Sequence, residues 1–275
     1  MREAATVLYA FCREADDLID SDPHATAATV DKLRQRLLGI YAEAALDHAV
    51  DRALRVVVTE EAIPIRLLEA LLEGLLWDAE GRRYETFDAL LTYAARVAGS
   101  VGVMMTLVMG DLSETVLARA CELGMAMQLT NIARDVGEDA GRGRIYLPLE
   151  WLRDSGVDPE AWLTRPAAST PIRRVVARLL GEADRLYADA NRGIAALPTD
   201  CRIAIRTASL VYADIGRSIR QADFDSVTRR AVVPGHRKLW LFLRAIAARF
   251  QRRPLPALPP LEATRFLLTD AAPNI

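Results

Sequence analysis

The chain has 275 residues, of which 51% are hydrophobic and 26% are charged, and its formal net charge at pH 7 is −2. This length and composition fit one large globular domain and exclude an intrinsically disordered protein, and the nearly balanced charge gives no support for nucleic acid as a partner. The three cysteines, Cys12, Cys121 and Cys201, are odd in number and lack a CxxC pair. They therefore predict neither a disulfide framework nor a zinc site.

Helical periodicity runs through almost the whole chain, beginning directly after Met1. Apolar residues recur at helical spacing, and prolines and glycines interrupt the pattern where helices should end. The segment Arg55–Thr59 is the one strand-like run, and we expect it to be helical because it has no partner strand. The pattern predicts an all-α fold in a single domain over residues 1–275, with helices near 3–20, 26–46, 50–62, 65–81, 87–109, 113–138, 172–196, 199–223 and 236–251.

The last part of the chain carries two further signals. The stretch RRPLPALPPLEA contains four prolines, which predicts a flexible tail over residues 252–275. Just before it, the segment 236–244 places basic residues beside large apolar ones. This pattern fits a helix that lies on an anionic membrane surface, and it fits an ordinary packed terminal helix at least as well.

Neither a membrane span nor a secretory signal is expected. The longest uncharged stretch, residues 97–110, is shorter than the roughly 20 apolar residues that a span needs. Charged residues follow Met1 too soon for a signal peptide. We therefore expect a cytoplasmic protein that is either soluble or peripheral on a membrane.

Two acidic motifs carry the chemistry. The first places Asp16 and Asp20 four residues apart, and the second spaces Asn131, Asp135 and Asp139 in the same way, so each set shares one helix face. One such motif alone is usually a solvated surface. Here the pattern occurs twice, and like charges at this spacing destabilise a helix unless a cation or a basic partner offsets them. The two motifs therefore predict a metal site.

Magnesium is the metal that fits these ligands, because it prefers oxygen and is commonly held by one or two carboxylates together with substrate phosphate. Two acidic faces across a cavity would hold Mg²⁺ on a diphosphate, with Arg13 and Arg134 in bidentate contact with it. The C–O bond could then ionise to an allylic carbocation, which needs a dry cavity. The small residues and methionines of 98–105 would suit its wall, although tight helix packing explains them as well. We expect Glu138 to pair outward with Arg142.

These motifs resemble those of the squalene and phytoene synthases. LYAFCREADDLID resembles the first aspartate-rich signature of that family, YAARVAGSVGVMM its tunnel helix, and MAMQLTNIARDVGEDAGRGRIYLP its second signature. The likeness continues through VYADIGRSIRQADFDSVTRRAVVPGHRKLW and covers roughly residues 1–245. Within the family, the region around the second signature looks most like bacterial phytoene synthases of carotenoid pathways.

The resemblance implies an isoprenoid synthase-type helical bundle around a central cavity. It also implies a Mg²⁺-dependent prenyltransferase, with Mn²⁺ as a substitute metal, that joins two geranylgeranyl diphosphates head to head. The reaction would pass through prephytoene diphosphate to phytoene without NADPH. Three alternatives stay open: a squalene, dehydrosqualene or hydroxysqualene-pathway synthase acting on farnesyl diphosphate, a class I terpene cyclase, and a non-catalytic family member.

The resemblance assigns site residues position by position. The metal ligands would be Asp16, Asp20, Asn131, Asp135 and Asp139, and the aspartates among them would be catalytic together with Tyr93. The substrate would be bound by Tyr9, Arg13, Gln128, Arg134, Tyr146, Tyr212 and one arginine of the pair at 229 and 230, for which we take Arg229. Without the resemblance, each cavity tyrosine would be interpreted as a core residue with a satisfied hydroxyl group.

One departure from the family concerns the beginning of the chain. Family members usually begin some tens of residues earlier, with a helix whose Ser-Phe segment touches the substrate diphosphate. Here Met1 falls where the first acidic helix begins, and no capping residue precedes its apolar pattern. Either residues precede Met1 or this version lacks part of its site, and we expect the 275-residue form to be a weak or inactive catalyst.

Overall fold

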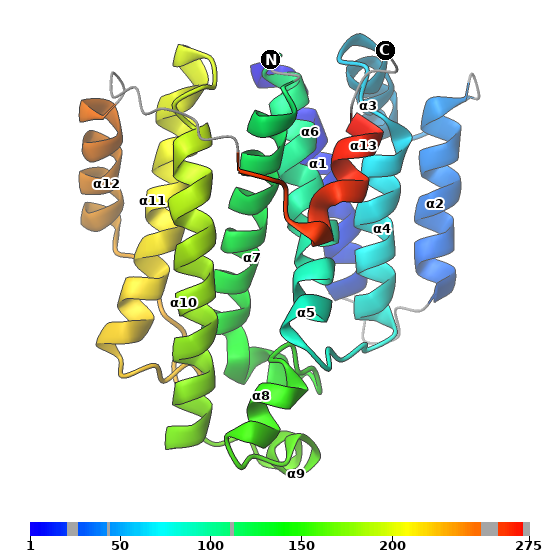
Figure 1. Ribbon diagram of the computed structural model, residues 1–275. Helices are drawn as coiled ribbons and strands as arrows, with labels where there is room; N and C mark the ends of the chain where they lie inside the picture. The colour runs from blue at the N-terminus through cyan, green and yellow to red at the C-terminus, as the bar shows by residue number, and fades with distance from the viewer. Residues whose placement is uncertain (21–26, 43–44, 111–112, 249–257, 272–275) are drawn as a thin grey trace.

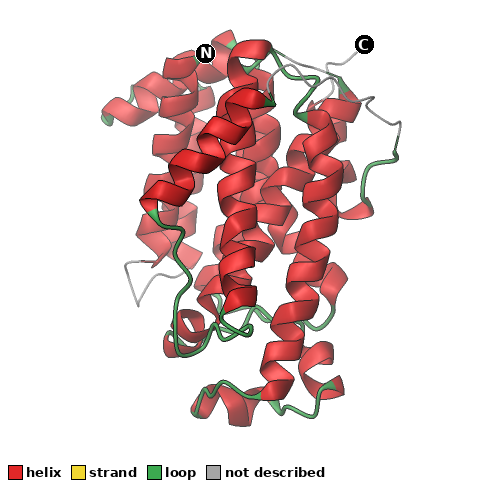
Figure 2. Ribbon diagram, turned by 90° about the vertical axis from the view of Figure 1, so that its left-hand side faces the viewer, coloured by secondary structure: helices red, strands yellow, loops and turns green. Residues whose placement is uncertain are grey.

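The structure is a computed structural model that describes residues 1–20, 27–42, 45–110, 113–248 and 258–271. These residues form helices and contain no strand, which confirms the predicted all-α class (Figures 1 and 2). The segment Arg55–Thr59 is helical, as expected. The elements are α1 (Arg2–Asp20), α2 (Ala27–Tyr41), α3 (Ala49–Glu60), α4 (Ile65–Ala79), α5 (Phe87–Ala94), η1 (Ala95–Gly99), α6 (Ser100–Val108), α7 (Glu114–Gly141), α8 (Leu149–Asp154), α9 (Pro159–Thr164), α10 (Thr170–Gly193), α11 (Thr199–Gln221), α12 (Gly235–Ala247), η2 (Glu262–Thr264) and α13 (Arg265–Ala271).

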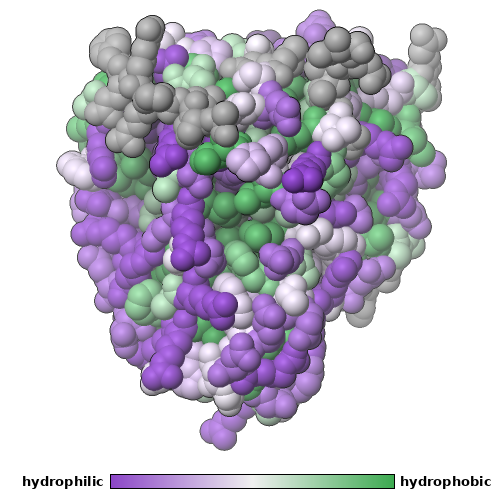
Figure 3. Space-filling model, viewed as in Figure 1, coloured by the Kyte–Doolittle hydropathy of each residue, from purple (hydrophilic) through white to green (hydrophobic). Residues whose placement is uncertain are grey.

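The long helices run side by side, with α7 in the middle of the bundle (Figure 1). Helix α7 contacts α10 and α11 on one side and α6 on the other, while α1 packs against α3 and α4. The short helices α8 and α9 lie together at one end, and α12 packs on the outside of α11. On the face seen in Figure 3, apolar side chains gather near the centre and hydrophilic ones surround them. The bundle is therefore built around one helix, α7, which carries the second acidic motif.

Local sequence explains where several helices begin. The side chain of Ser113 accepts a hydrogen bond from the backbone N–H of Val116 at the start of α7. Asp158 does the same for Ala161 at the start of α9, where Pro159 stands in the first turn. Both are common N-terminal caps. The sequence pattern predicted no helix between residues 138 and 172. Helices α8 and α9 were missed because each has only six residues, too few for a helical period to be recognised.

The segment from Phe87 to Val108 is one continuous helix with a turn of π-helix, η1, in its middle. It crosses α7 very closely. A Cβ atom added to Gly102 would lie 2.3 Å from the carbonyl oxygen of Ala120, and one added to Gly124 would lie 2.2 Å from the carbonyl oxygen of Ala98. Only glycine allows this approach. The helix is long and apolar enough to span a membrane, but 56% of its most apolar window is buried in the bundle, as in core helices of other folds.

The end of the chain differs from the predicted flexible tail. Residues 252–257 and 272–275 lie outside the described part, but 258–271 contain η2 and α13. Helix α13 contacts α4, α6 and α7, and both Leu267 and Leu268 are buried. The prediction is therefore wrong for these residues. The prediction rested on the four prolines of the tail. The short apolar segment that follows them packs on the bundle, because this removes its leucines from water.

Candidate active site

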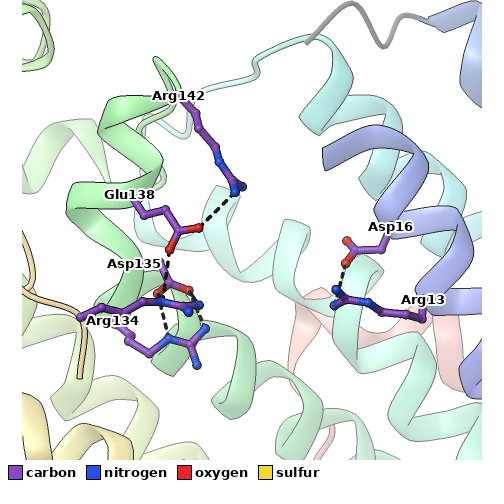
Figure 4. A network of polar contacts seen from close by, with 7 residues as sticks. Arg13, Asp16, Arg134, Asp135, Glu138 and Arg142 are labelled. Atoms are coloured by element: carbon purple, nitrogen blue, oxygen red, sulfur yellow. Dashed lines mark hydrogen bonds and ion pairs between the residues drawn. The ribbon is translucent and has the colours of Figure 1, made fainter. Parts of the chain in front are cut away.

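A polar pocket of about 320 Å³ brings the two acidic motifs together. Helix α7 forms one wall and α1 faces it across the pocket, with Arg13 and Asp16 extending toward the α7 side chains (Figure 4). The side chain of Asp20 lies outside the described part of the chain. The residues that line the pocket are Arg13, Asp16, Asp78, Tyr93, Gln128, Asn131, Ile132, Arg134, Asp135, Glu138, Asp139, Arg142, Arg144, Tyr146 and Arg230.

Asp135 lies between two arginines. Arg134 donates hydrogen bonds to both carboxylate oxygens at 2.8 and 2.5 Å, and Arg230 donates from Nε at 2.7 Å. Burial by itself would raise the pKa of Asp135, but the hydrogen bonds from these arginines outweigh it and lower the pKa. Asp135 is therefore ionised at neutral pH and is hydrogen-bonded to two guanidinium groups.

Arg230 reaches the pocket because its loop docks on Gly137 of α7. An added Cβ atom at Gly137 would lie 2.1 Å from the carbonyl oxygen of Val227, and the Gly137 N–H donates to the carbonyl oxygen of Ser226 at 2.9 Å. Arg229, which the sequence analysis selected, is exposed and is absent from the pocket lining. Its neighbour Arg230 lines the pocket instead. Which of the two arginines reaches the pocket depends on how the loop docks on α7.

Asp139 and Asn131 complete the polar face of α7. Burial, followed by the nearby charge of Asp135, raises the pKa of Asp139 to about 7. The Oδ1 atom of Asn131 is buried and has no hydrogen-bond partner among the described residues. Arg144 and Arg142 oppose this rise without cancelling it. A bound cation would stabilise the ionised carboxylate and satisfy the unpaired amide oxygen.

This donor set consists of oxygen atoms and so fits a hard cation such as Mg²⁺. Within the described residues, no three Asp, Glu, His or Cys side chains gather closely enough to hold an ion by themselves. Mg²⁺ usually takes further ligands from water and substrate phosphate. The residues present therefore fit the metal, provided that a ligand supplies the remaining oxygens.

Glu138 differs in part from its predicted role. It accepts a hydrogen bond from Arg142 at 3.0 Å, as expected, but it also lies 3.2 Å from Arg230 and lines the pocket. Its carboxylate is therefore directed into the site rather than away from it (Figure 4). The reason is that the Arg230 loop adds a second basic partner on the pocket side.

Asp78 on α4 is a site residue that the sequence analysis missed. Its two carboxylate oxygens accept hydrogen bonds from Tyr93 at 2.8 Å and from Tyr146 at 2.7 Å. The two rings stack at 5.5 Å, and burial raises the pKa of both tyrosines. Asp78 lies in the last turn of a mostly apolar helix and belongs to no acidic motif. Tyr93 and Tyr146 are 15 and 68 residues away in the sequence, and no helical spacing connects residues so far apart.

An apolar tunnel of about 430 Å³ adjoins the polar pocket. The two cavities share Gln128 and Asn131, so the tunnel begins where the polar face of α7 ends. The predicted wall segment contributes to it, as do Tyr9 and Tyr212, which line the tunnel rather than the polar pocket. The lining also includes Met109, Val116, Arg119, Met127, Gly193 and Leu197.

Comparison with known proteins adds three findings. The family model described as squalene/phytoene synthase matches residues 1–237. A phytoene synthase of Rhodobacter capsulatus is 48% identical over 265 residues, which cover 96% of this chain and 78% of that protein. A phytoene synthase of Cereibacter sphaeroides is 47% identical over 258 residues, which cover 90% of this chain and 73% of that protein.

A solved structure shows the same architecture. The crystal structure of a dehydrosqualene synthase in complex with a ligand superposes with a TM-score of 0.79 at 32% sequence identity, covering 89% of this chain and 85% of that one. The fold similarity therefore extends over most of the chain.

Proposed function

Because this chain belongs to the squalene/phytoene synthase family, we propose that it is a prenyltransferase that condenses two geranylgeranyl diphosphates head to head to give phytoene. Relatives named phytoene synthase at 47 to 48% identity over most of the chain support this activity over the alternatives that act on farnesyl diphosphate. The observation that carries the proposal is the polar pocket joined to an apolar tunnel at Gln128 and Asn131. That arrangement matches a ligand with a diphosphate head and a long hydrocarbon chain.

The polar pocket would bind and activate the diphosphate. The metal ligands we propose are Asp16, Asn131, Asp135 and Asp139, with Asp20 as a further candidate from the sequence. When bound there, divalent metal ions supply positive charge that stabilises the departing diphosphate. The guanidinium groups of Arg134 and Arg230 flank the same position and would donate bidentate hydrogen bonds to the leaving oxygens. No reductant such as NADPH is needed for the proposed reaction.

The remaining residues would protect the cation and direct its fate. The tunnel is lined mostly by apolar residues, which would leave few nucleophiles to react with an allylic cation. The stacked rings of Tyr93 and Tyr146 stand at the pocket wall, where their faces can stabilise positive charge. Asp78 holds both hydroxyl groups through hydrogen bonds, which fixes the rings.

The test is a product assay. The protein is incubated with Mg²⁺ and either geranylgeranyl or farnesyl diphosphate, and the hydrocarbon is identified by mass; we expect phytoene from the longer substrate. Asp135→Ala should abolish the product. The matched control is Asp31→Ala, which removes an exposed carboxylate paired with Arg34 on α2 and should leave turnover unchanged. Full activity of Asp135→Ala, or of the protein in EDTA, would contradict the mechanism.

Contact with a membrane stays part of the proposal. Helix α12 buries only Leu241 and Ala245 against the bundle. The large apolar residues exposed on it are Leu239, Trp240, Phe242 and Leu243. Arg237 and Lys238 precede this run and Arg244 follows it, which suits an anionic surface. Flotation with vesicles that contain phosphatidylglycerol would test this contact, and a protein that stays at the bottom of the gradient would favour the packed-helix interpretation.

A further inference from the structure

Two arginines together use the acceptor positions of Asp135. Arg134 donates from Nε to Oδ1 at 2.8 Å and from Nη2 to Oδ2 at 2.5 Å (Figure 4). Arg230 donates to the same two oxygens, from Nε at 2.7 Å and from Nη2 at 3.3 Å. A carboxylate has about four lone-pair sites, and these four hydrogen bonds occupy them. As folded, Asp135 therefore has no lone pair left to offer a metal ion.

This arrangement conflicts with the role of Asp135 as a metal ligand. A cation bound by Asp135 needs at least one of its lone pairs, and it would also lie beside two guanidinium groups, whose positive charges repel it. At least one arginine must therefore leave Asp135 before a metal ion can bind there. The arginine that leaves needs a new anionic partner, and the oxygens of a diphosphate in the same pocket are a strong one.

Arg230 is the arginine that can leave. Its side chain is 54% exposed and comes from the loop between α11 and α12, whereas the side chain of Arg134 is 18% exposed and directly precedes Asp135 on α7. Nε of Arg230 also lies 3.2 Å from Oε2 of Glu138, so a second carboxylate keeps the guanidinium group near the pocket. An exposed ion pair contributes little to fold stability. Arg230 can therefore exchange its partner without disturbing the bundle.

We propose that Arg230 controls access to the metal site: its guanidinium group occupies Asp135 in the ligand-free fold and moves to the diphosphate when the diphosphate binds together with its metal ions. The inference rests on the proposed function, because it takes Asp135 as a metal ligand. A metal ion alone has to displace Arg230 without offering it a new partner and therefore binds weakly. A metal–diphosphate complex offers that partner, so one side chain couples the binding of the two ligands.

The first test measures metal binding to the full chain without turnover. The protein is titrated with Mn²⁺ alone, and bound Mn²⁺ is followed by the loss of the electron paramagnetic resonance signal of the free ion. Arg230→Met removes two hydrogen bonds that the ion otherwise has to break. One hydrogen bond to a charged group changes an equilibrium by about tenfold or more, so we expect the variant to bind Mn²⁺ about tenfold or more tightly than the wild type. Arg230→Ala is measured as a second variant, and circular dichroism checks that each is folded.

The second test uses inorganic pyrophosphate that is premixed with Mg²⁺ and titrated into the protein by calorimetry. Here Arg230 is a donor to the ligand, so Arg230→Met should bind the complex about tenfold or more weakly than the wild type. The proposal therefore predicts opposite shifts in one variant, tighter for the metal alone and weaker for the metal with pyrophosphate. A residue that only supports the fold of the pocket would weaken both when it is replaced.

Two controls separate an exchange at Asp135 from a general change of charge. Arg229→Met removes the same charge from an exposed neighbour that is absent from the pocket lining, and it should keep the wild-type affinity for Mn²⁺. Arg230→Met/Asp135→Asn should bind Mn²⁺ no more tightly than Asp135→Asn alone.

The outcomes for the exchange and for the proposed function are distinct. A folded Arg230→Met that binds Mn²⁺ no more tightly than the wild type overturns the exchange, and so does a gain that persists in the Asp135→Asn background. A gain that depends on Asp135, in a protein that forms no phytoene from geranylgeranyl diphosphate, supports the exchange and contradicts the proposed function alone.

Discussion

Replacing Gly137 with alanine would place a methyl group 2.1 Å from the carbonyl oxygen of Val227 and 2.9 Å from its Cα atom. Contacts of this length do not occur, so the loop must retreat by about 1 Å or more, at a cost of about 1–3 kcal/mol for an overpacked site. The loop is stiff, because Asp225 accepts hydrogen bonds from the N–H groups of Val227 and Thr228. It should therefore move as a unit and carry Arg230 away from Asp135.

The loss of one donor that stabilises a leaving group is worth about 10²–10³ in rate, so we expect Gly137→Ala to lower kcat by a factor in that range. The melting temperature should fall by a few degrees only. Gly141 on the same helix is the matched control, since nothing lies within 4 Å of its added Cβ atom. Product assays and thermal melts of both variants decide the matter. Wild-type turnover of Gly137→Ala would refute the idea that this contact places Arg230.

Three further predictions concern single residues. Arg230→Met should lower turnover by about 10²-fold and Arg229→Met should leave it unchanged, in the same product assay. Asp78→Ala leaves two tyrosine hydroxyl groups without their acceptor, which costs about 1–3 kcal/mol for each; thermal melts should show a smaller loss for Asp78→Asn, and equal losses would contradict this account. The pKa of Asp139 is raised to about 7 in the metal-free fold from 3.8, so the folded state holds a proton that the unfolded chain releases and stability declines as the pH rises between these values. Asp139→Asn should therefore raise the melting temperature of the metal-free protein at pH 8 and not at pH 3.5; an equal shift at both would argue against a raised pKa of Asp139 in the fold.

The sequence by itself determined the features that depend on local periodicity. Asn131, Asp135 and Asp139 had to share one face of a helix, because four residues make slightly more than one helical turn. Asp16 of the first motif and the three α7 residues of the second line one pocket. The all-α class followed from the same periodicity and is confirmed. The assignment of individual ligands and substrate contacts stays a prediction that the product assays above will test.

Only the tertiary structure decided which distant side chains meet. Asp78 joins Tyr93 and Tyr146 because α4 packs beside the π-helical turn, and Arg230 rather than Arg229 reaches Asp135 because a loop docks on Gly137. The buried tail helix α13 and the position of Arg119 in the tunnel have the same origin. Such contacts depend on how closely two helices or a loop can approach. Single small residues and the packing of the whole bundle determine that distance. Neither of them produces a periodic pattern in the sequence.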